Sequence, residues 1–91
     1  MIPSPESLPR LAPGCRINDK KENPRLLMKG DKSLRLHGPS LEIVERCDGR
    51  HSVKQIVTDL QLLYAKAEPK RVEQDVLSYL SLLATQFFIE L

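Results

Sequence analysis

Apolar and polar residues alternate between residues 14 and 37, and this period of two predicts short β-strands. Leu34 and Leu36, for example, face one side of an extended segment while Arg35 faces the other. Such alternation suits an antiparallel sheet that is covered on one face only. Strands are expected at residues 14–19, 25–29 and 33–37, joined by a polar turn at residues 20–24 and a tight hairpin turn at Gly30 and Asp31.

From Gly38 onward the period changes to about 3.6, which predicts three helices. Pro39 suits the first position of a short helix, and Gly49 suits the left-handed residue that ends it. Ser52 caps a second helix, residues 65–68 form a loop, and Pro69 begins a third helix that runs to about Gln86. The expected core positions are Leu41, Ile43, Val44 and Cys47 in the first helix, Val53, Ile56, Val57, Leu60, Leu63 and Tyr64 in the second, and Val72, Val76, Tyr79, Leu80, Leu83 and Phe87 in the third.

The third helix carries more apolar surface than a helix that packs on one side needs. Leu77 and Ala84 widen its core stripe, and Leu82 lies alone on the opposite flank. Leu82 stands there beside Arg71, Asp75 and Ser78. The surplus either packs against the sheet or the first helix, or forms the wall of a binding groove.

Residues 1–13 hold four of the seven prolines, so this arm should be extended and poorly ordered alone. We expect it to dock on its own domain or on a neighbouring copy. The chain is therefore divided into a proline-rich arm at residues 1–13 and one domain at residues 14–91. Strands followed by helices, with a tight junction between the first two helices, predict an α+β fold: a winged-helix-like domain with a three-stranded antiparallel sheet followed by three helices.

The 91 residues suit one small domain, and 41% hydrophobic residues are enough for a core. No apolar run is long enough to span a membrane and the first residues lack the pattern of a secretory signal, so a cytoplasmic protein is expected. Cys15 and Cys47 are then free thiols. Residues 1–37 carry eight Lys and Arg against four acidic residues, a net +4, while residues 38–91 carry a net −2. The basic half either favours an acidic partner or is a solvated surface.

The sequence offers no arrangement typical of an enzyme, a metal site or a bound cofactor, and none of the three is expected. His37 and His51 are fourteen residues apart, without the spacing of metal ligands. A DNA-binding winged helix is the alternative class, and it would require basic residues on a recognition helix. The second helix instead pairs Lys54 with Asp59, and steep salt-dependent binding to duplex DNA would be the evidence for this class.

Three groups of residues carry a resemblance to a known family. They are Leu36-His37-Gly38-Pro39-Ser40 with Ile43 and Val44; Cys47-Asp48-Gly49-Arg50-His51-Ser52-Val53 with Ile56; and Val72, Asp75-Val76, Tyr79-Leu80 and Leu83. On these residues, and over roughly residues 8–90, the chain resembles the PqqD family of pyrroloquinoline quinone biosynthesis. It departs from the family at the entry of the first helix and at Gln86-Phe87, where a glycine usually precedes an aromatic-aliphatic pair such as Phe88-Ile89.

The resemblance implies a non-catalytic peptide chaperone that binds the ribosomal precursor peptide PqqA. Such domains present the peptide to the radical SAM enzyme PqqE, which joins a Glu to a Tyr, and related domains recognise leader peptides in other modified-peptide pathways. The resemblance thus implies a RiPP recognition element, and the alternatives are a leader-peptide recognition domain of another modified-peptide pathway or the DNA-binding protein above. The peptide-binding residues implied are Lys32, Ser33, Leu34, Arg35, Leu36 and His37 on the third strand and Arg71, Asp75, Ser78 and Leu82 on the third helix. A free strand edge and the arm also make a homodimer an expected possibility.

Overall fold

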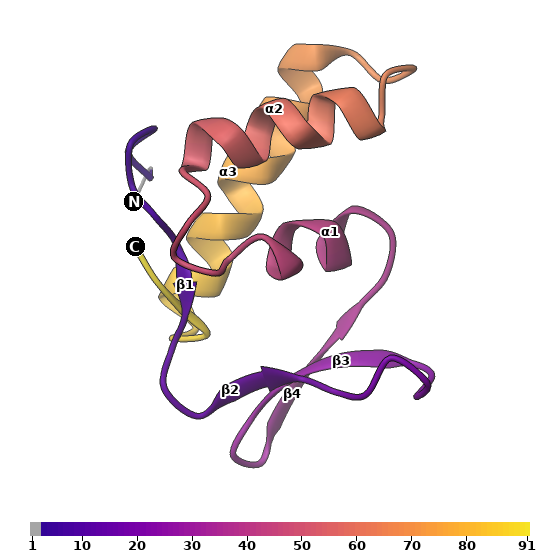
Figure 1. The fold of residues 1–91 in the computed structure, drawn as a ribbon, viewed down its shortest axis with the longest axis vertical. Coiled ribbons are helices and arrows are strands. Elements are labelled where there is room, and N and C mark those ends of the chain that lie inside the picture. Colours follow the sequence, from indigo (N-terminus) through magenta and orange to yellow (C-terminus); the bar gives the residue numbers. More distant parts are fainter. Residues whose placement is uncertain (1–2) are drawn as a thin grey trace.

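The alternating segment folds as a three-stranded antiparallel sheet in the computed structural model, which describes residues 3–91. Its strands are β2 (Cys15–Ile17), β3 (Arg25–Lys29) and β4 (Lys32–Leu36), in the order β2-β3-β4 (Figure 1). The predicted sheet is confirmed, with β2 shorter than expected. Asn18 ends β2 because its buried side chain accepts from the Leu26 N–H at 2.9 Å and donates to the Pro24 carbonyl at 2.9 Å.

The turn between β3 and β4 is the tight hairpin that Gly30 and Asp31 predict. Gly30 has a φ of 59°, and Lys29 pairs with Lys32 directly across the turn. A positive φ at the first central residue is typical of a type II′ turn, in which glycine is favoured at that position. This turn fixes the β3–β4 register, which places Leu27 opposite Leu34.

Three helices follow the sheet, as predicted: α1 (Pro39–Glu45), α2 (Val53–Leu63) and α3 (Pro69–Thr85). The α+β order of a three-stranded sheet followed by three helices is therefore confirmed. Pro39 and Pro69 stand at the helix starts. Ser52 and Gln55 form a capping box, in which each side chain accepts from the other residue's backbone N–H. Such a cap contributes about 1 kcal/mol to helix stability.

The predicted end of the first helix at Gly49 is wrong, although Gly49 does adopt a positive φ of 77°. The helix stops at Glu45, and the Arg46 and Cys47 N–H groups donate to the carbonyls of Ile43 and Val44 in a tightened last turn. The Gly49 N–H donates instead to the Pro9 carbonyl at 2.8 Å. The left-handed residue therefore belongs to the junction between α1 and α2, where it meets the N-terminal arm.

The predicted burial of Phe87 is also wrong, because α3 ends two residues earlier. The Phe87 N–H donates to the Ala84 carbonyl and the Phe88 N–H to the Leu83 carbonyl, the two hydrogen bonds of a Schellman motif. Phe87 takes the left-handed position, with a φ of 63°, and its side chain is 70% exposed. The reversal puts Phe88 into the core in its place.

The core fills the space between the sheet, α1 and the pair α2–α3 (Figure 1). Leu63 was expected there but is half exposed at the last residue of α2, and the neighbouring Tyr64 packs against the core instead. Leu27 and Leu36 are the fully enclosed contributions of the sheet. The other core side chains are Ile43, Val44, Cys47, Val53, Ile56, Val57, Leu60, Val72, Val76, Leu80, Leu83, Phe88 and Ile89.

The N-terminal arm docks on its own domain, which was one of the two expected arrangements. The carbonyls of Pro5 and Ser7 accept from the Lys54 and Val53 N–H groups, which lie in the first turn of α2. Those donors have no partner within the helix, so the arm satisfies them. The arm's β1 (Arg10–Leu11) pairs with β5 (Ile89–Glu90) in a second sheet that the sequence did not predict.

Within residues 3–91 no helix has the length and apolar character that crossing a membrane requires.

Candidate functional site

The open side of β4 is the first feature of the candidate site. In the order β2-β3-β4, this strand pairs with β3 on one side, and no described strand lies on the other. In a two-residue hairpin the flanking pair exchanges backbone hydrogen bonds, and such pairs recur at every second position. Lys32, Leu34 and Leu36 therefore direct their N–H and C=O groups toward β3. Ser33 and Arg35 direct theirs to the open edge, where an extended segment can bond to them.

A groove of about 350 Å³ lies between the start of β4 and the end of α3. Leu34, Leu82, Leu83 and Phe88 supply its apolar lining. Polar groups stand at its margins, so an extended segment on β4 would find both apolar contacts and hydrogen-bonding groups there. Its lining residues are Lys32, Ser33 and Leu34 from β4 and Leu82, Leu83, Gln86 and Phe88 from the last turn of α3 and beyond it.

The structure brings four of the ten sequence-predicted site residues together in this groove: Lys32, Ser33, Leu34 and Leu82. Arg35 and His37 are exposed along and just after β4, whereas the Leu36 side chain is 3% exposed and lies in the core. Leu36 thus offers a partner no side-chain contact on this surface.

The remaining three predicted residues lie further toward the start of α3 and do not line the groove. Arg71 and Asp75 form an exposed ion pair with 3.7 Å between Nε and Oδ1, and Ser78 is exposed one turn below. Leu82, which is 46% exposed, is where this face of α3 meets the groove.

Leu83, Gln86 and Phe88 were missed as groove residues. The helical periodicity marked Leu83 as core, and it is fully buried, so its contact with the groove floor could not be separated from its core role. Phe88 was missed because no glycine marks the end of α3. If the helix continued through Phe87, it would direct Phe87 into the core in place of Phe88.

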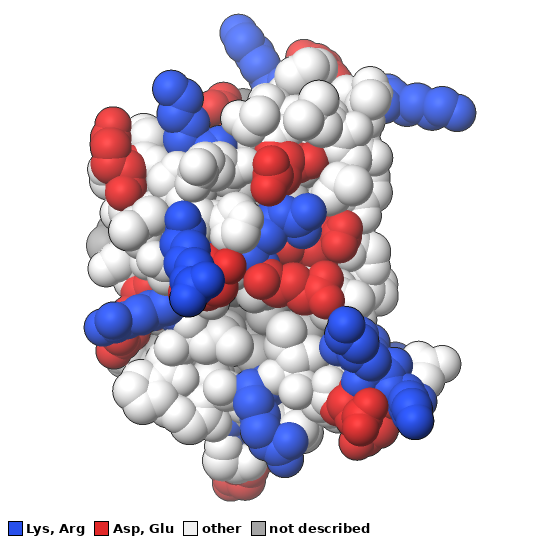
Figure 2. Space-filling view, in the orientation of Figure 1, with Lys and Arg blue, Asp and Glu red and all other residues white. Residues whose placement is uncertain are grey.

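Positive charge gathers where the β3–β4 hairpin meets the end of α3. Lys29 Nζ donates to the Phe87 carbonyl at 2.6 Å and lies 5.9 Å from the centre of the Phe87 ring. Lys32 pairs with Lys29 across the hairpin and is exposed. Asp31 in the turn offsets one of the two positive charges, and Lys32 is the one of these three residues that lines the groove. Over α1 and α2, basic and acidic side chains are interspersed on the face that Figure 2 shows.

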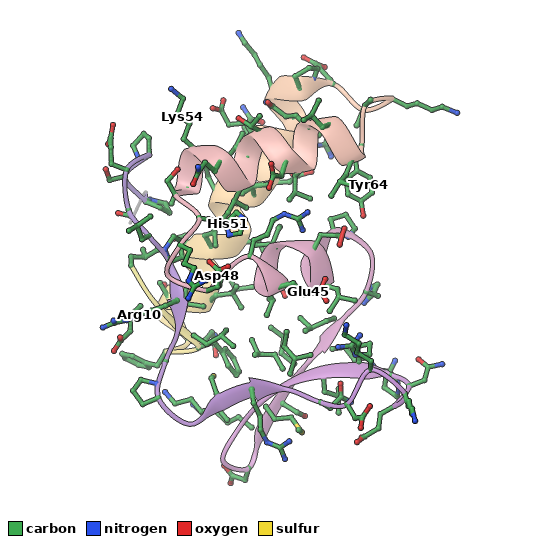
Figure 3. The ribbon with its side chains drawn as sticks, in the orientation of Figure 1. Arg10, Glu45, Asp48, His51, Lys54 and Tyr64 are labelled. Carbon is green, nitrogen blue, oxygen red and sulfur yellow. The ribbon has the colours of Figure 1, made fainter. Side chains whose placement is uncertain are left out.

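The junction of residues 47–53 carries the resemblance to the family but lies apart from the groove lining. Asp48 Oδ1 accepts from the backbone N–H groups of Arg50 and His51, at 2.8 and 3.1 Å, and both its oxygens lie 3.0 Å from His51 Nδ1. Figure 3 shows Asp48 and His51 together at this turn, with Arg10 of the arm beside them. The Asp48 contacts close the turn between α1 and α2, and backbone hydrogen bonds from Leu11 N–H to the Cys47 carbonyl and from Gly49 N–H to the Pro9 carbonyl tie it to the arm.

Hydrogen bonding and burial shift two pKa values at the junction. The hydrogen bond from His51, with help from the backbone N–H groups, lowers the pKa of Asp48 to about 2. Burial raises the pKa of the Cys47 thiol to about 12, and the nearby Asp48 charge adds to the shift. Burial also raises the pKa of Cys15. Both thiols are therefore protonated at neutral pH and poor nucleophiles.

Asp48→Asn is expected to destabilise the domain by about 1 kcal/mol at neutral pH, a value discounted because Asp48 is solvent-exposed. The folded state lowers this pKa, so the carboxylate contributes stability above about pH 4, and that contribution is lost as the pH falls through about 2. The difference between the two proteins should therefore shrink on acidification. Urea unfolding at neutral pH and near pH 2 measures it, and an equal difference at both would contradict the assignment.

An α+β domain with an open strand edge beside an apolar helix groove has the architecture of domains that bind an extended peptide by strand addition. Comparison with known proteins gives the family. The family model for coenzyme PQQ synthesis protein D (PqqD) matches residues 25–89, and the chain belongs to the PqqD family.

Relatives are similar to this chain over nearly its whole length. The PqqA binding protein of Pseudomonas aeruginosa strain UCBPP-PA14 is 30% identical over 91 residues, which cover 99% of this chain and 97% of the relative. The PqqA binding protein of Stutzerimonas stutzeri strain A1501 is 27% identical over 85 residues, or 92% of this chain and 90% of the relative.

A solved structure shares the fold. The solution structure of the PqqD truncation of Methylobacterium extorquens PqqCD superimposes with a TM-score of 0.74 at 30% identity. The match covers 97% of this chain and 94% of that one. That protein is described as a functional, stand-alone RiPP recognition element. The family suspected from the sequence is thus confirmed.

Proposed function

We propose that this chain is a peptide chaperone that binds a PqqA-like precursor peptide in the cytoplasm and presents it to a PqqE-like radical SAM enzyme. The observation that carries the proposal is the open edge of β4 beside the groove at the end of α3. Relatives named PqqA binding protein, similar over almost the full chain, support the choice of peptide.

Binding proceeds by addition of the peptide as a fourth strand next to β4. The outward N–H and C=O groups of Ser33 and Arg35 hydrogen-bond to the peptide backbone. Peptide side chains that face α3 enter the groove against Leu34, Leu82 and Phe88, while the alternate ones face solvent. The backbone bonds hold the peptide extended, and the groove selects its sequence.

This geometry supports presentation, because only one edge and one face of the added strand are covered. The other edge and the segments beyond β4 stay accessible to an enzyme. We expect a PqqE-like enzyme to retain the chain on an affinity column in the presence of the peptide and to retain less without it.

The direct test of the proposal is calorimetric titration of the protein with a synthetic PqqA-type peptide. We expect saturable 1:1 binding, and a scrambled peptide of the same composition serves as the control. Equal affinity for both peptides, or no binding, would overturn the proposal. Duplex DNA in the same assay addresses the alternative class, for which a steep loss of affinity with salt is expected.

Charge reversal at Lys32 and Arg35 is expected to weaken peptide binding by roughly tenfold at low salt and by less at high salt. Both residues are exposed on β4, where they attract acidic residues of the peptide. Arg16→Glu with Lys20→Glu is the matched control, since these two residues are exposed on and after β2 and change the net charge equally. Equal losses in both double variants would show a net-charge effect without a role for β4.

A homodimer through β4 would occupy the same edge as the peptide. Peptide addition should then lower the fraction of dimer, and sizing at several protein concentrations measures this.

A further inference from the structure

Phe87 takes the left-handed position of the Schellman motif that ends α3, but the stability of the domain does not account for a phenylalanine there. Among residues 3–91 it is the only residue other than glycine with a positive φ, at 63°. A side chain with a Cβ is strained in this region, whereas glycine adopts it freely. The ring is 70% exposed, so little apolar burial offsets the strain.

The ring nevertheless stands at a defined place, the hairpin end of the groove. Its two neighbours in the chain, Gln86 and Phe88, both line the groove. Lys29 holds the turn by donating to the Phe87 carbonyl at 2.6 Å, and its ammonium lies 5.9 Å from the ring centre. Neither Phe87 nor Lys29 is itself in the groove lining, so the ring borders the groove, and a strand added to β4 would reach it only by continuing past Lys32.

Two ammonium groups share the face of the sheet that is turned toward the ring. Side chains alternate along a strand, so Lys29 lies on the face of the buried Leu27, and Lys32 lies on the face of Leu34. These two pairs are opposite each other in the β3–β4 register, so both lysines are on the helix side. An aromatic ring and two cations there are complementary to a peptide with an apolar and an acidic side chain on one face.

We propose that Phe87 is a specificity-determining residue of the peptide site, where its ring binds an apolar side chain of a strand that carries an acidic residue two positions away, opposite Lys29 and Lys32. This inference rests on the proposed function. The spacing of two follows because residues i and i+2 of an extended peptide lie on the same face. The ring thus extends the groove past the hairpin and selects for both features together.

Phe87→Gly separates this role from a structural one, because it removes the backbone strain and the ring together. Loss of strain acts on stability, and loss of the ring acts on peptide affinity. We expect the melting temperature to stay the same or rise, while the affinity for a PqqA-type peptide falls at least about fivefold. Phe87→Tyr, which keeps the ring, should bind within about twofold of the unaltered protein. Leu62→Ala is the matched control: Leu62 is 73% exposed on α2 and is absent from the groove lining, so its replacement should not change the affinity.

Peptide variants complete the test. Replacing the apolar residue of the peptide by Ala should weaken binding to the unaltered protein and have little further effect on Phe87→Gly. Replacing the acidic residue of the peptide by Gln should likewise weaken binding to the unaltered protein and have little further effect on Lys29→Met. Unchanged affinity of Phe87→Gly would overturn the inference, and so would additive losses in both double-mutant cycles. If the unaltered protein still binds the peptide in that case, the proposed function stands. No binding by the unaltered protein would overturn both.

Discussion

Replacing Arg35 by proline is expected to lower the affinity for the precursor peptide by about tenfold or more, while the domain stays folded. The Arg35 N–H points to the open edge of β4, so its loss leaves the β3–β4 ladder intact. A peptide carbonyl that loses this donor in a desolvated interface costs about 1–3 kcal/mol. The proline ring also projects toward the incoming strand. Calorimetry with a PqqA-type peptide measures the loss, and amide spectra check the fold.

Arg35→Ala is the control for this prediction, because it removes the side chain and keeps the backbone N–H. Its affinity should fall only by the contribution of the charge, so the difference between the two variants reports the backbone bond. Leu34→Pro should behave differently, since the Leu34 N–H points to β3 and its loss weakens the sheet itself. Wild-type affinity in folded Arg35→Pro would contradict strand addition at β4.

Phe88→Ala is expected to destabilise the domain by about 3–5 kcal/mol, the usual cost of removing a buried aromatic ring. The side chain is 4% exposed and packs in the core directly after the Schellman turn. For a domain of this size the melting temperature should fall by more than about 12 °C. Thermal unfolding followed by circular dichroism measures the shift.

Phe88→Leu should have a melting temperature between those of the unaltered protein and Phe88→Ala, because it keeps part of the apolar volume. Leu62→Ala provides the comparison at an exposed apolar position and should change the melting temperature by little more than about 2 °C. A small shift for Phe88→Ala would show that this ring does not close the core.

The elements with strong local signals could be predicted from the sequence. The β3–β4 hairpin follows from alternation around Gly30. As expected, Ser52 caps α2 and α3 begins at Pro69. Capping and turn residues act within a few positions of the chain, so one sequence is enough to locate them.

The features that depend on contacts between distant residues could not be predicted in the same way. β1 and β5 have two residues each, too few for a pattern, and they form because the arm meets the C-terminal segment. Gly49 adopts its positive φ where Pro9 accepts from its N–H. The end of α3 could not be predicted, because Phe87 occupies the left-handed position at which a glycine would have indicated the end of a helix.

For the candidate site, the strand was easier to predict than the helix. β4 was expected from alternation and from the family resemblance, and it is an edge strand. On α3, the flank of Arg71, Asp75 and Ser78 was expected to form the groove wall. The groove instead lies at the C-terminal end of α3, from Leu82 onward, because the Lys32 end of β4 lies beside the last turn of this helix. A helical wheel gives the angular position of a residue and no information on which turn faces the strand.

The pairing of β1 with β5 places both ends of the described chain on one side of the molecule, where Arg10 lies opposite Glu90 and their side chains form an ion pair at 3.0 Å (Figure 1). Neighbouring termini are the geometry that domain fusion and circular permutation require. An enzyme joined at either end by a short linker would thus be tethered through the same ribbon, and its local concentration near a bound peptide would be set by linker length. Neither described end lines the groove, so a fusion at either one would leave the peptide site clear.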